Sequence, residues 1–448
     1  MNFLAEKLAT CGAGDVLWFP AEAAPVVASH LVFALGRVPF KTWQGKRVAL
    51  GDMPVVELVA TLIFLDGLAE AILLLPNEDD VQTRSTRLTQ AKIDVVLEHD
   101  GFEFLKSLEM ASVAAISSTS PNVDERPAPV ETTWLLATSG TTGTPKLIPH
   151  TFASLTRSMS ARSIGDNYVW GSLYSLRRFA GLQVFLQSWM CGTPLVLNDE
   201  GADLTAVLGR FIAIGCNALS ATPSMWRKLA MHPLFDRLNL KQITLGGEIV
   251  DQVILDILTK RFPTARITHI YASTEAGVGF AVRDVKSGFP VAYLDSPPSG
   301  VAMRVDGQGH LCFHLVDPPL KANANSTWID SGDVVEIHAG RVRFLGRANG
   351  SINVGGNKVM PEEIESVIKE LPEVAFVQVR ARKSAMLGSL VEAAITPMPG
   401  TVMDAAFKKK VTIYCRARLD GFKVPAFIVA ADGIQLTASG KLSRMTVE

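Results

Sequence analysis

The chain has 448 residues, of which 48% are apolar, and its 43 basic and 44 acidic residues leave a formal net charge of −1. A chain of this length can bury a large core and is expected to form more than one domain, and its balanced charge argues against nucleic acid as a partner. The five cysteines are scattered without a Cys-x-x-Cys pair, and residues 1–14 lack a signal pattern, so we expect reduced thiols in a cytoplasmic protein.

The first hundred residues alternate between short apolar strands and helices. Strands are predicted at 47–50, 71–75 and 95–97. A helix is predicted over 55–65, between the first two strands, and this alternation is typical of a parallel sheet covered by helices. The most apolar stretch, 55–76, carries Glu57, Asp66 and Glu70. We therefore interpret it as a buried helix and strand rather than as a membrane span.

A loop rich in glycine and hydroxyl groups follows the apolar run 134–137. It reads Thr-Ser-Gly-Thr-Thr-Gly-Thr-Pro-Lys. The glycines permit turns that point successive N–H groups at one anion, and the hydroxyls and lysine add donors and positive charge. It is not the standard P-loop, because Pro145 removes a donor and Leu147 follows the lysine. Taken alone, this composition fits a polar surface turn better than a polyphosphate site. The candidate phosphate-binding residues are Thr138, Ser139, Gly140, Thr141, Thr142, Gly143 and Lys146.

The alternation of strand and helix resumes in the middle of the chain. Further strands are predicted at 195–197, 218–220, 243–245 and 267–270. Polar or small residues follow the last three at Ser220, at the turn 246–248 and at Tyr271, as Thr138 follows the strand before it. Ligands bind beyond the carboxyl ends of parallel strands. We therefore expect these four positions to meet at one edge of a sheet.

The last third of the chain changes character twice. Residues 295–344 carry short alternating runs that predict a β-rich subdomain, and the segment 346–350 has the composition of a hinge. Beyond it we predict helix, strand, strand, helix and strand, the first helix over 361–370 with proline in its first turn. The predicted division is a domain over 1–346 and a small α+β domain over 347–448.

Four further motifs accompany the phosphate-binding candidate. They are Tyr271-Ala272-Ser273-Thr274-Glu275, Trp328 to Asp333, Gly346-Arg347 followed by Gly355-Gly356 and Pro361 to Glu365, and Ser439 to Arg444. Their order and spacing resemble the adenylate-forming superfamily, which contains acyl- and aryl-CoA synthetases, the adenylation domains of non-ribosomal peptide synthetases, and luciferases. The resemblance runs from about Arg47 to Arg444. It implies an α/β fold, with a large N-terminal domain of parallel and mixed sheets sandwiched by helices, a β-rich subdomain, and a small C-terminal α+β domain on a hinge.

The resemblance also implies a role for each candidate in the nucleotide site. The loop would hold the β- and γ-phosphates of ATP, Thr274 would contact the α-phosphate, and Glu275 would ligate Mg²⁺. Tyr271 would stack on adenine beside Ala272. Asp333 would accept hydrogen bonds from the ribose hydroxyls, helped by Arg347. Each residue has an ordinary alternative, such as a helix cap for Glu275, a turn for Asp333 and a surface ion pair for Arg347.

The acid pocket and the catalytic lysine follow from the same resemblance. Lys441 would lie between the attacking carboxylate and the α-phosphate, although a Ser-Gly-Lys near the end of a chain is also an ordinary solvated tail. The walls of the pocket would come from Phe179, Leu182, Ser220 and Gly246, and the turn that continues through Gly247 and Glu248 would line the adenine pocket as well. Arg177 and Arg178 stand where an aromatic or histidine signature is common, so one of them is a candidate for a second carboxylate or polar tail on the substrate.

The thiol step would use the C-terminal domain. That domain would rotate about a hinge at Asn349, where Asp or Lys is usual, so that Gly355 and Gly356 line a pantetheine tunnel. A tight β-turn explains the two glycines equally well. The basic cluster 408–410, with Arg416 and Arg418, fits CoA, an acidic carrier protein or an ordinary solvated helix face.

The sequence therefore predicts a ligase that uses ATP and Mg²⁺ to activate a small acyl or aryl acid and transfers it to CoA. Transfer to the phosphopantetheine arm of a carrier protein is the alternative. A luciferase-type monooxygenase and a non-catalytic nucleotide-binding relative are further alternatives, and retention of Thr274, Glu275, Asp333 and Lys441 argues against the last. Neither nucleic acid nor a membrane is an expected partner.

Overall fold

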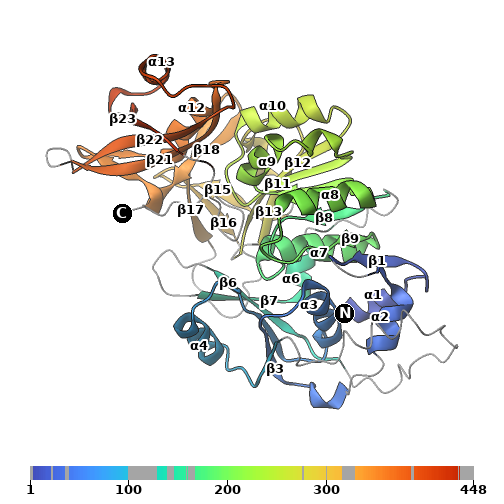
Figure 1. Ribbon diagram of the computed structural model, residues 1–448. Helices are drawn as coiled ribbons and strands as arrows, with labels where there is room; N and C mark the ends of the chain where they lie inside the picture. The colour runs from blue at the N-terminus through green and yellow to red at the C-terminus, as the bar shows by residue number, and fades with distance from the viewer. Residues whose placement is uncertain are drawn as a thin grey trace.

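The computed structural model forms a large N-terminal domain and a smaller C-terminal domain (Figure 1). It describes residues 4–21, 24–35, 40–98, 129–138, 146–157, 159, 167–274, 277–298, 300–314, 328–384, 388–431 and 433. In that part of the chain, no helix combines the length and the apolar character that crossing a membrane requires. All five cysteines are free thiols, as expected; Cys216, Cys312 and Cys415 are buried, and Cys11 and Cys191 are half-buried.

A five-stranded sheet carries the predicted N-terminal strands. Its order is β5-β3-β4-β6-β7, with β3 (Arg47–Leu50), β4 (Ala71–Leu74), β5 (Val95–Leu97), β6 (Thr133–Thr138) and β7 (Lys146–His150). The first four strands are parallel, and β7 is antiparallel to β6. Side chains alternate between two cores: Ile72 and Leu74 face the large core around α3 (Val55–Leu65), whereas Leu73 packs on the other side near α4 (Val81–Gln90). This alternation follows from the two-residue period of a strand.

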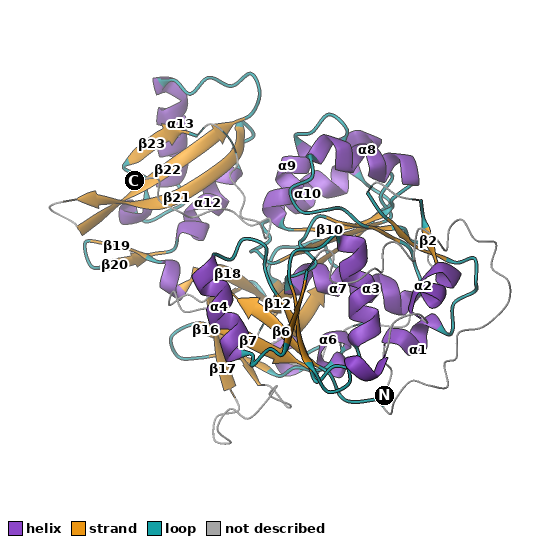
Figure 2. Cartoon of the chain, turned by 60° about the horizontal axis from the view of Figure 1, so that its bottom comes forward, coloured by secondary structure: helices purple, strands orange, loops and turns teal. Residues whose placement is uncertain are grey.

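An eight-stranded sheet forms the centre of the N-terminal domain, in the order β13-β12-β11-β10-β8-β9-β1-β2. The strands are β1 (Val16–Phe19), β2 (Val26–Val27), β8 (Trp170–Ser172), β9 (Leu195–Val196), β10 (Ala218–Ala221), β11 (Gln242–Gly246), β12 (Arg266–Ser273) and β13 (Gly277–Val282). Figure 2 shows α8 (Leu204–Ile214), α9 (Pro223–Ala230) and α10 (Gln252–Arg261) on one face, and α7 (Phe179–Cys191) on the other. The apolar residues of these helices pack in two separate cores, which explains the sandwich of helices around the sheet.

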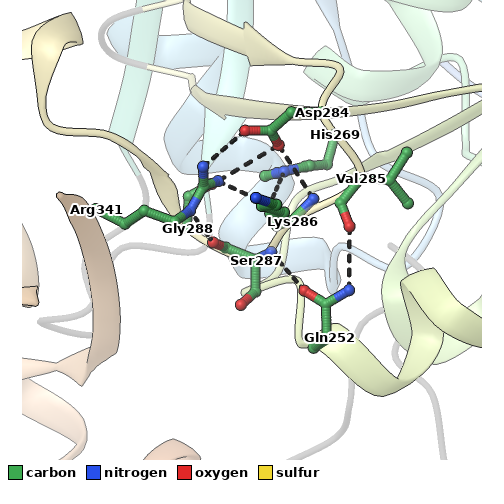
Figure 3. A network of polar contacts seen from close by, with 8 residues as sticks. All are labelled: Gln252, His269, Asp284, Val285, Lys286, Ser287, Gly288 and Arg341. Carbon is green, nitrogen blue, oxygen red and sulfur yellow. Dashed lines mark hydrogen bonds and ion pairs between the residues drawn. The ribbon is translucent and has the colours of Figure 1, made fainter. Parts of the chain in front are cut away.

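A third, antiparallel sheet forms the predicted β-rich subdomain, in the order β14-β18-β17-β16-β15. Its strands are β14 (Phe289–Pro290), β15 (Met303–Val305), β16 (His310–His314), β17 (Trp328–His338) and β18 (Arg341–Arg347). A polar network ties it to the central sheet (Figure 3). Arg341 of β18 binds Asp284 at 2.6 Å and the carbonyls of 286–288, while His269 of β12 contacts the Lys286 carbonyl at 3.0 Å. The two sheets are thereby fixed relative to each other.

The C-terminal domain is α+β. Its sheet has the order β20-β19-β22-β21, and β23 pairs with β22. The elements are β19 (Ile352–Val354), β20 (Asn357–Val359), α12 (Pro361–Lys369), β21 (Val374–Ser384), β22 (Gly388–Pro397), α13 (Ala405–Arg416) and β23 (Phe427–Ala430). The predicted order of helix, strand, strand, helix and strand is confirmed from α12 onward, and the short β19–β20 hairpin precedes it.

Short elements complete the described chain. They are α1 (Leu4–Leu8), α2 (Ala28–Leu35), α6 (Phe152–Thr156), α11 (Ala292–Asp295) and the 3₁₀ turns 40–42, 235–237, 348–350 and 421–423. The predicted α/β fold class is confirmed. The expectation of one common sheet edge needs a correction: Thr138 ends a strand of the five-stranded sheet, whereas Ser220, Gly246 and Tyr271 belong to the eight-stranded sheet. Apolar periodicity identifies strands, but it does not say which sheet each joins.

Candidate active site

Three parallel strands of the central sheet end side by side. Ser220 of β10 is in register with Thr244 of β11, and Gly246 of β11 is in register with Ile270 of β12. Tyr271 comes one residue later. The three predicted positions in this sheet are therefore neighbours at its carboxyl edge, which is where open parallel sheets bind ligands.

Asp333 links the end of β12 to the β-rich subdomain. Its carboxylate accepts a hydrogen bond from the Tyr271 hydroxyl at 2.5 Å and another from Nε of Arg347 at 3.1 Å. Burial raises the pKa of Tyr271, and the neighbouring Asp333 raises it further, so the phenol keeps the proton that it donates. Asp333 is buried, but the Arg347 side chain is 52% exposed. The group therefore opens to solvent on its arginine side.

The Tyr271 ring is held by aromatic packing. It lies nearly parallel to Phe280, Phe313 and Phe344, with centroid distances of 5.3, 5.2 and 5.3 Å. These rings belong to the core of the subdomain and fix the direction of the phenol group. Ala272, the next residue, is half-buried and pairs with Val278 of β13. Stacking of adenine on Tyr271 remains a prediction.

The candidate phosphate loop connects two paired strands, β6 and β7. Thr138, the last residue of β6, pairs with Lys146, the first residue of β7, and Lys146 is exposed. The intervening candidates, Ser139, Gly140, Thr141, Thr142 and Gly143, lie outside the described residues. The described chain therefore shows that the two residues flanking the loop lie next to each other, at the end of the strand pair that the loop connects.

A histidine that the sequence reasoning missed connects this hairpin to β12. Nε2 of His150, at the end of β7, lies 2.8 Å from the carbonyl oxygen of Thr274, which directly follows β12. The contact brings the predicted α-phosphate residue close to the strand that leaves the phosphate loop. The only hint in the sequence was the position of His150 four residues after Lys146.

Glu275, the predicted Mg²⁺ ligand, lies outside the described residues, and the described part of the chain contains no cluster of three metal-ligating side chains.

The predicted acid pocket surrounds the start of α7. Phe179 is half-buried and packs against the His150 ring with a centroid distance of 5.7 Å, whereas Leu182 is fully buried in the large core. Tyr174, which the sequence reasoning did not single out, donates its hydroxyl to the Gly246 carbonyl at 3.2 Å. Burial raises the pKa of Tyr174, so it acts here as a neutral donor. The contact joins the segment that precedes α7 to the last residue of β11.

The turn after β11 also organises a neighbouring helix. Gly247 has a φ of +85° and is exposed, a conformation that favours glycine. Glu248 accepts a hydrogen bond from the backbone N–H of Ser224 at 2.9 Å, and the side chain of Thr222 caps the same helix, α9. A carboxylate at a helix N-terminus is stabilising. Glu248 therefore has a capping role in addition to its predicted place in the pocket wall.

Arg177 and Arg178 have internal partners. Arg177 is 2% exposed, and its guanidinium group donates to the carbonyls of Leu50 at 2.9 Å and of Met53 and Leu75 at 3.4 Å. Burial lowers its pKa. It donates hydrogen bonds to buried backbone carbonyl groups at the end of β3, directly after β4 and at Met53. This role does not fit the hypothesis that Arg177 binds a substrate carboxylate.

Arg178 forms an ion pair with Glu78 and donates to the carbonyl of Ala137 at 3.2 Å. Ala137 precedes Thr138, so this arginine braces the strand that enters the phosphate loop.

Three of the four C-terminal candidates lie in the described part of the chain. Asn349 is exposed in the 3₁₀ turn 348–350, where the hinge is predicted. Gly355 and Gly356 form the β19–β20 turn with φ of +56° and +91°, and Asn353 accepts from the Gly356 N–H at 3.0 Å. They are a tight β-turn, as one alternative predicted, and the tunnel remains a prediction. Lys441 lies outside the described residues.

A model of the AMP-binding enzyme family matches residues 59–311, and its companion, the AMP-binding enzyme C-terminal domain, matches residues 363–441. The chain belongs to the AMP-binding enzyme family. The predicted membership of the adenylate-forming superfamily is thereby confirmed. Both matches span candidate residues, including Thr138 to Lys146 in the first and Lys441 in the second.

Relatives of this AMP-binding enzyme include a 2-succinylbenzoate–CoA ligase of Bacillus velezensis, 26% identical over 90% of this chain and 87% of the relative. Surfactin synthase subunit 1 of Bacillus subtilis is 28% identical over 69% of this chain and 10% of its own.

Solved structures share the fold at low identity. The anthranilate CoA ligase AuaEII in complex with anthranoyl-AMP has a TM-score of 0.78 at 19% identity, covering 98% of this chain and 95% of that one.

Proposed function

We propose that this AMP-binding enzyme is an AMP-forming acid–thiol ligase for a small acyl or aryl carboxylic acid. A carboxylate oxygen attacks the α-phosphorus of ATP, the bond to the β-phosphate breaks, and pyrophosphate leaves. The sulfur of CoA then attacks the acyl carbon, the thiol proton is lost to solvent, and AMP leaves. The observation that supports this best is that Tyr271 of β12 contacts Asp333 of β17, while Thr274, just after β12, contacts His150 of β7, the strand that begins at Lys146.

Each residue in this arrangement has a simple task. Asp333 accepts hydrogen bonds from the ribose hydroxyls, and Tyr271 and Arg347 hold its carboxylate in place. Lys146 and Lys441 supply positive charge against the repulsion between two anionic reactants. A charge about 4 Å from developing negative charge is worth about 4 kcal/mol at an effective dielectric constant of about 20. MgATP enters as the substrate, and Glu275 is our proposed ligand for its metal.

CoA is the acceptor that we propose, because relatives such as the 2-succinylbenzoate–CoA ligase act on CoA by name. Loading of a carrier protein is the second candidate, supported by the similarity to surfactin synthase subunit 1. Exposed Lys409, Lys410, Arg416 and Arg418 on and after α13 suit either anionic acceptor. We further propose that residues 1–346 and 347–448 are the moving units in a cytoplasmic enzyme, with the hinge at Asn349.

The first test is pyrophosphate–ATP exchange across a panel of aryl, short-chain and dicarboxylic acids, without thiol. We expect exchange that depends on one acid class, and thioester product when CoA is added. A product found only with a holo carrier protein would favour the alternative acceptor. Conversion of ATP to ADP and phosphate, or no exchange with any acid, would contradict the proposed reaction.

Substitution of Lys441 should affect the two half-reactions differently. We expect Lys441→Ala to slow adenylate formation by about 10²–10³-fold, since the transition-state charge loses its partner. Thiol attack on preformed acyl-adenylate should proceed at nearly the wild-type rate. Equal losses in both half-reactions would exclude the role proposed for this lysine.

A further inference from the structure

We propose that His150 is a positioning residue for adenylate formation. Through its hydrogen bond to the Thr274 carbonyl, it sets the distance between β7, the strand that begins at Lys146, and Thr274, the proposed contact of the α-phosphate. The inference rests on the proposed function, because it concerns the same reaction. It adds a residue that touches no reactant and acts through the backbone of Thr274.

His150 has a fixed place relative to the two residues that flank the phosphate loop. It lies at the end of β7, paired with Trp134 of β6, in the same ladder that pairs Lys146 with Thr138. Its side chain is 2% exposed. The β6–β7 ladder therefore fixes the imidazole ring relative to Thr138 and Lys146, the two residues that flank the loop.

The contact of His150 crosses from one sheet to another. β7 belongs to the five-stranded sheet, while Thr274 directly follows β12 of the eight-stranded sheet. The two residues are 124 positions apart, and Nε2 lies 2.8 Å from the Thr274 oxygen. The bond is partly buried, and a hydrogen bond is stronger where the surroundings have a lower dielectric constant than water. It therefore joins two sheets that each supply a predicted phosphate contact, Lys146 at the start of β7 and Thr274 just after β12.

The chemistry of the partners fixes the histidine. A carbonyl oxygen only accepts hydrogen bonds, so Nε2 carries a proton. On the other side of the ring, Nδ1 lies 3.2 Å from Oγ of Ser154, which accepts from the Thr151 N–H at 3.0 Å in the capping box of α6. One ring face packs against Phe179. Contacts with α6 and α7 thus hold the ring in the orientation that points Nε2 at Thr274.

The chain offers a matched control in His269 (Figure 3). It is also buried, 7% exposed, and its Nε2 also lies 3.0 Å from a backbone carbonyl, that of Lys286. It belongs to β12, the same strand that leads to Thr274, but its partner lies in the loop after β13. A histidine that only stabilises the fold should behave like His269.

The experiment compares His150→Phe, which keeps an aromatic ring but removes the donor, with His269→Phe. We expect His150→Phe to lower the rate of adenylate formation by about 10–100-fold, since a misplacement of about 1 Å at a reacting centre has an effect of that order. Thiol attack on preformed acyl-adenylate should change by less than about threefold. His269→Phe should lower the thermal midpoint to a similar extent while leaving adenylate formation within about threefold of the wild type.

Two amide substitutions at His150 distinguish loss of the hydrogen bond from a general folding defect. His150→Gln retains an N–H donor of similar reach, so it should form adenylate at least about tenfold faster than His150→Phe. The side chain in His150→Asn is too short to reach the carbonyl, so this variant should be as slow as His150→Phe. Equal rates for these two variants, an unchanged rate in His150→Phe, or an equal loss in His269→Phe would each overturn the inference. Wild-type exchange is measured first: its absence contradicts the proposed function itself, whereas exchange that tolerates His150→Phe contradicts this inference alone.

Discussion

Two buried aspartates, Asp333 at the sheet edge and Asp251 at the start of α10, each pair with an arginine, but their surroundings differ. The aspartates are similarly buried, 5% and 8% exposed. The partner of Asp251 is Arg227, whose side chain is 5% exposed, whereas the partner of Asp333 is Arg347, 52% exposed. Burial of a carboxylate therefore does not by itself mark a functional site. The exposure of its partner separates an internal ion pair from one that a ligand can reach.

Asp251 is fully engaged within the protein. It caps α10 by accepting from the Ile254 N–H at 3.1 Å, binds Arg227 at 2.5 Å and lies 3.8 Å from Lys369 of α12. The last contact crosses from the N-terminal to the C-terminal domain. Asp333 instead bridges Tyr271 and Arg347 at the carboxyl edge of the central sheet. We therefore assign Asp251 to stability and Asp333 to nucleotide binding.

The largest effect is expected from Arg227→Ala. Removing one partner of a buried ion pair leaves an uncompensated charge, so the free energy of unfolding should fall by about 3–5 kcal/mol. Denaturant titration measures it, with Arg347→Ala as the control, which should lose less than about 1 kcal/mol because its side chain is half-exposed. Equal losses in the two variants would break the comparison.

Asp333→Ala should act on catalysis. Losing a hydrogen bond between a charged acceptor and ribose should lower kcat/KM for ATP by about 10–100-fold, equivalent to about 1.5–3 kcal/mol. Steady-state pyrophosphate exchange at varied ATP measures this change. In Asp251→Ala, the protein that remains folded should keep its KM for ATP. An increase in KM confined to Asp251→Ala would reverse our assignment of the two aspartates.

The next largest effect is expected from low pH, which should remove the stabilisation that the Asp251–Arg227 pair provides. Burial of Asp251 would raise its pKa, but Arg227 and Lys369 outweigh burial and hold the pKa below its ordinary value. The ionised pair therefore adds stability above the unfolded-state pKa of about 3.9, and this is lost as the pH falls through the folded-state pKa. Below about pH 4, unfolding free energy should depend on pH more weakly in Asp251→Asn than in the wild type, by up to about 1.4 kcal/mol per pH unit. Parallel pH profiles would contradict this.

The smallest effect is expected from Lys369→Met. Its contact with Asp251 is long, 3.8 Å, and Arg227 remains in place, so the unfolding free energy should fall by less than about 1 kcal/mol. Denaturant titration beside Arg227→Ala gives the comparison. A loss as large as that of Arg227→Ala would mean that the internal pair depends on docking of the C-terminal domain.

Local patterns predicted the fold well where one element decides the outcome. The strand 47–50 and the helix 55–65 appear with the predicted bounds, because continuous apolar runs bounded by polar residues specify buried elements. Asp333, Tyr271 and Arg347 were also predicted, from motif resemblance, and the structure brings them into contact. Their roles toward ATP remain predictions.

Long-range partners could not be predicted. Nothing local in the sequence pairs His150 with Thr274 or Tyr174 with Gly246, because these hydrogen bonds depend on how two sheets and α7 pack. Arg177 shows the same limit, since neighbouring arginines look alike in sequence, but this one points into the core. The assignment of Thr138 to a separate sheet likewise follows from topology rather than from periodicity.

The most direct test of the account is a crystal structure of the enzyme with a hydrolysis-resistant acyl-adenylate analogue. We predict the ribose hydroxyls on the Asp333 carboxylate, the phosphate beside Thr274, and the acyl group near Phe179. An analogue bound elsewhere, with the Asp333 carboxylate contacting only Tyr271 and Arg347 and no contact to Thr274, would contradict the proposed site.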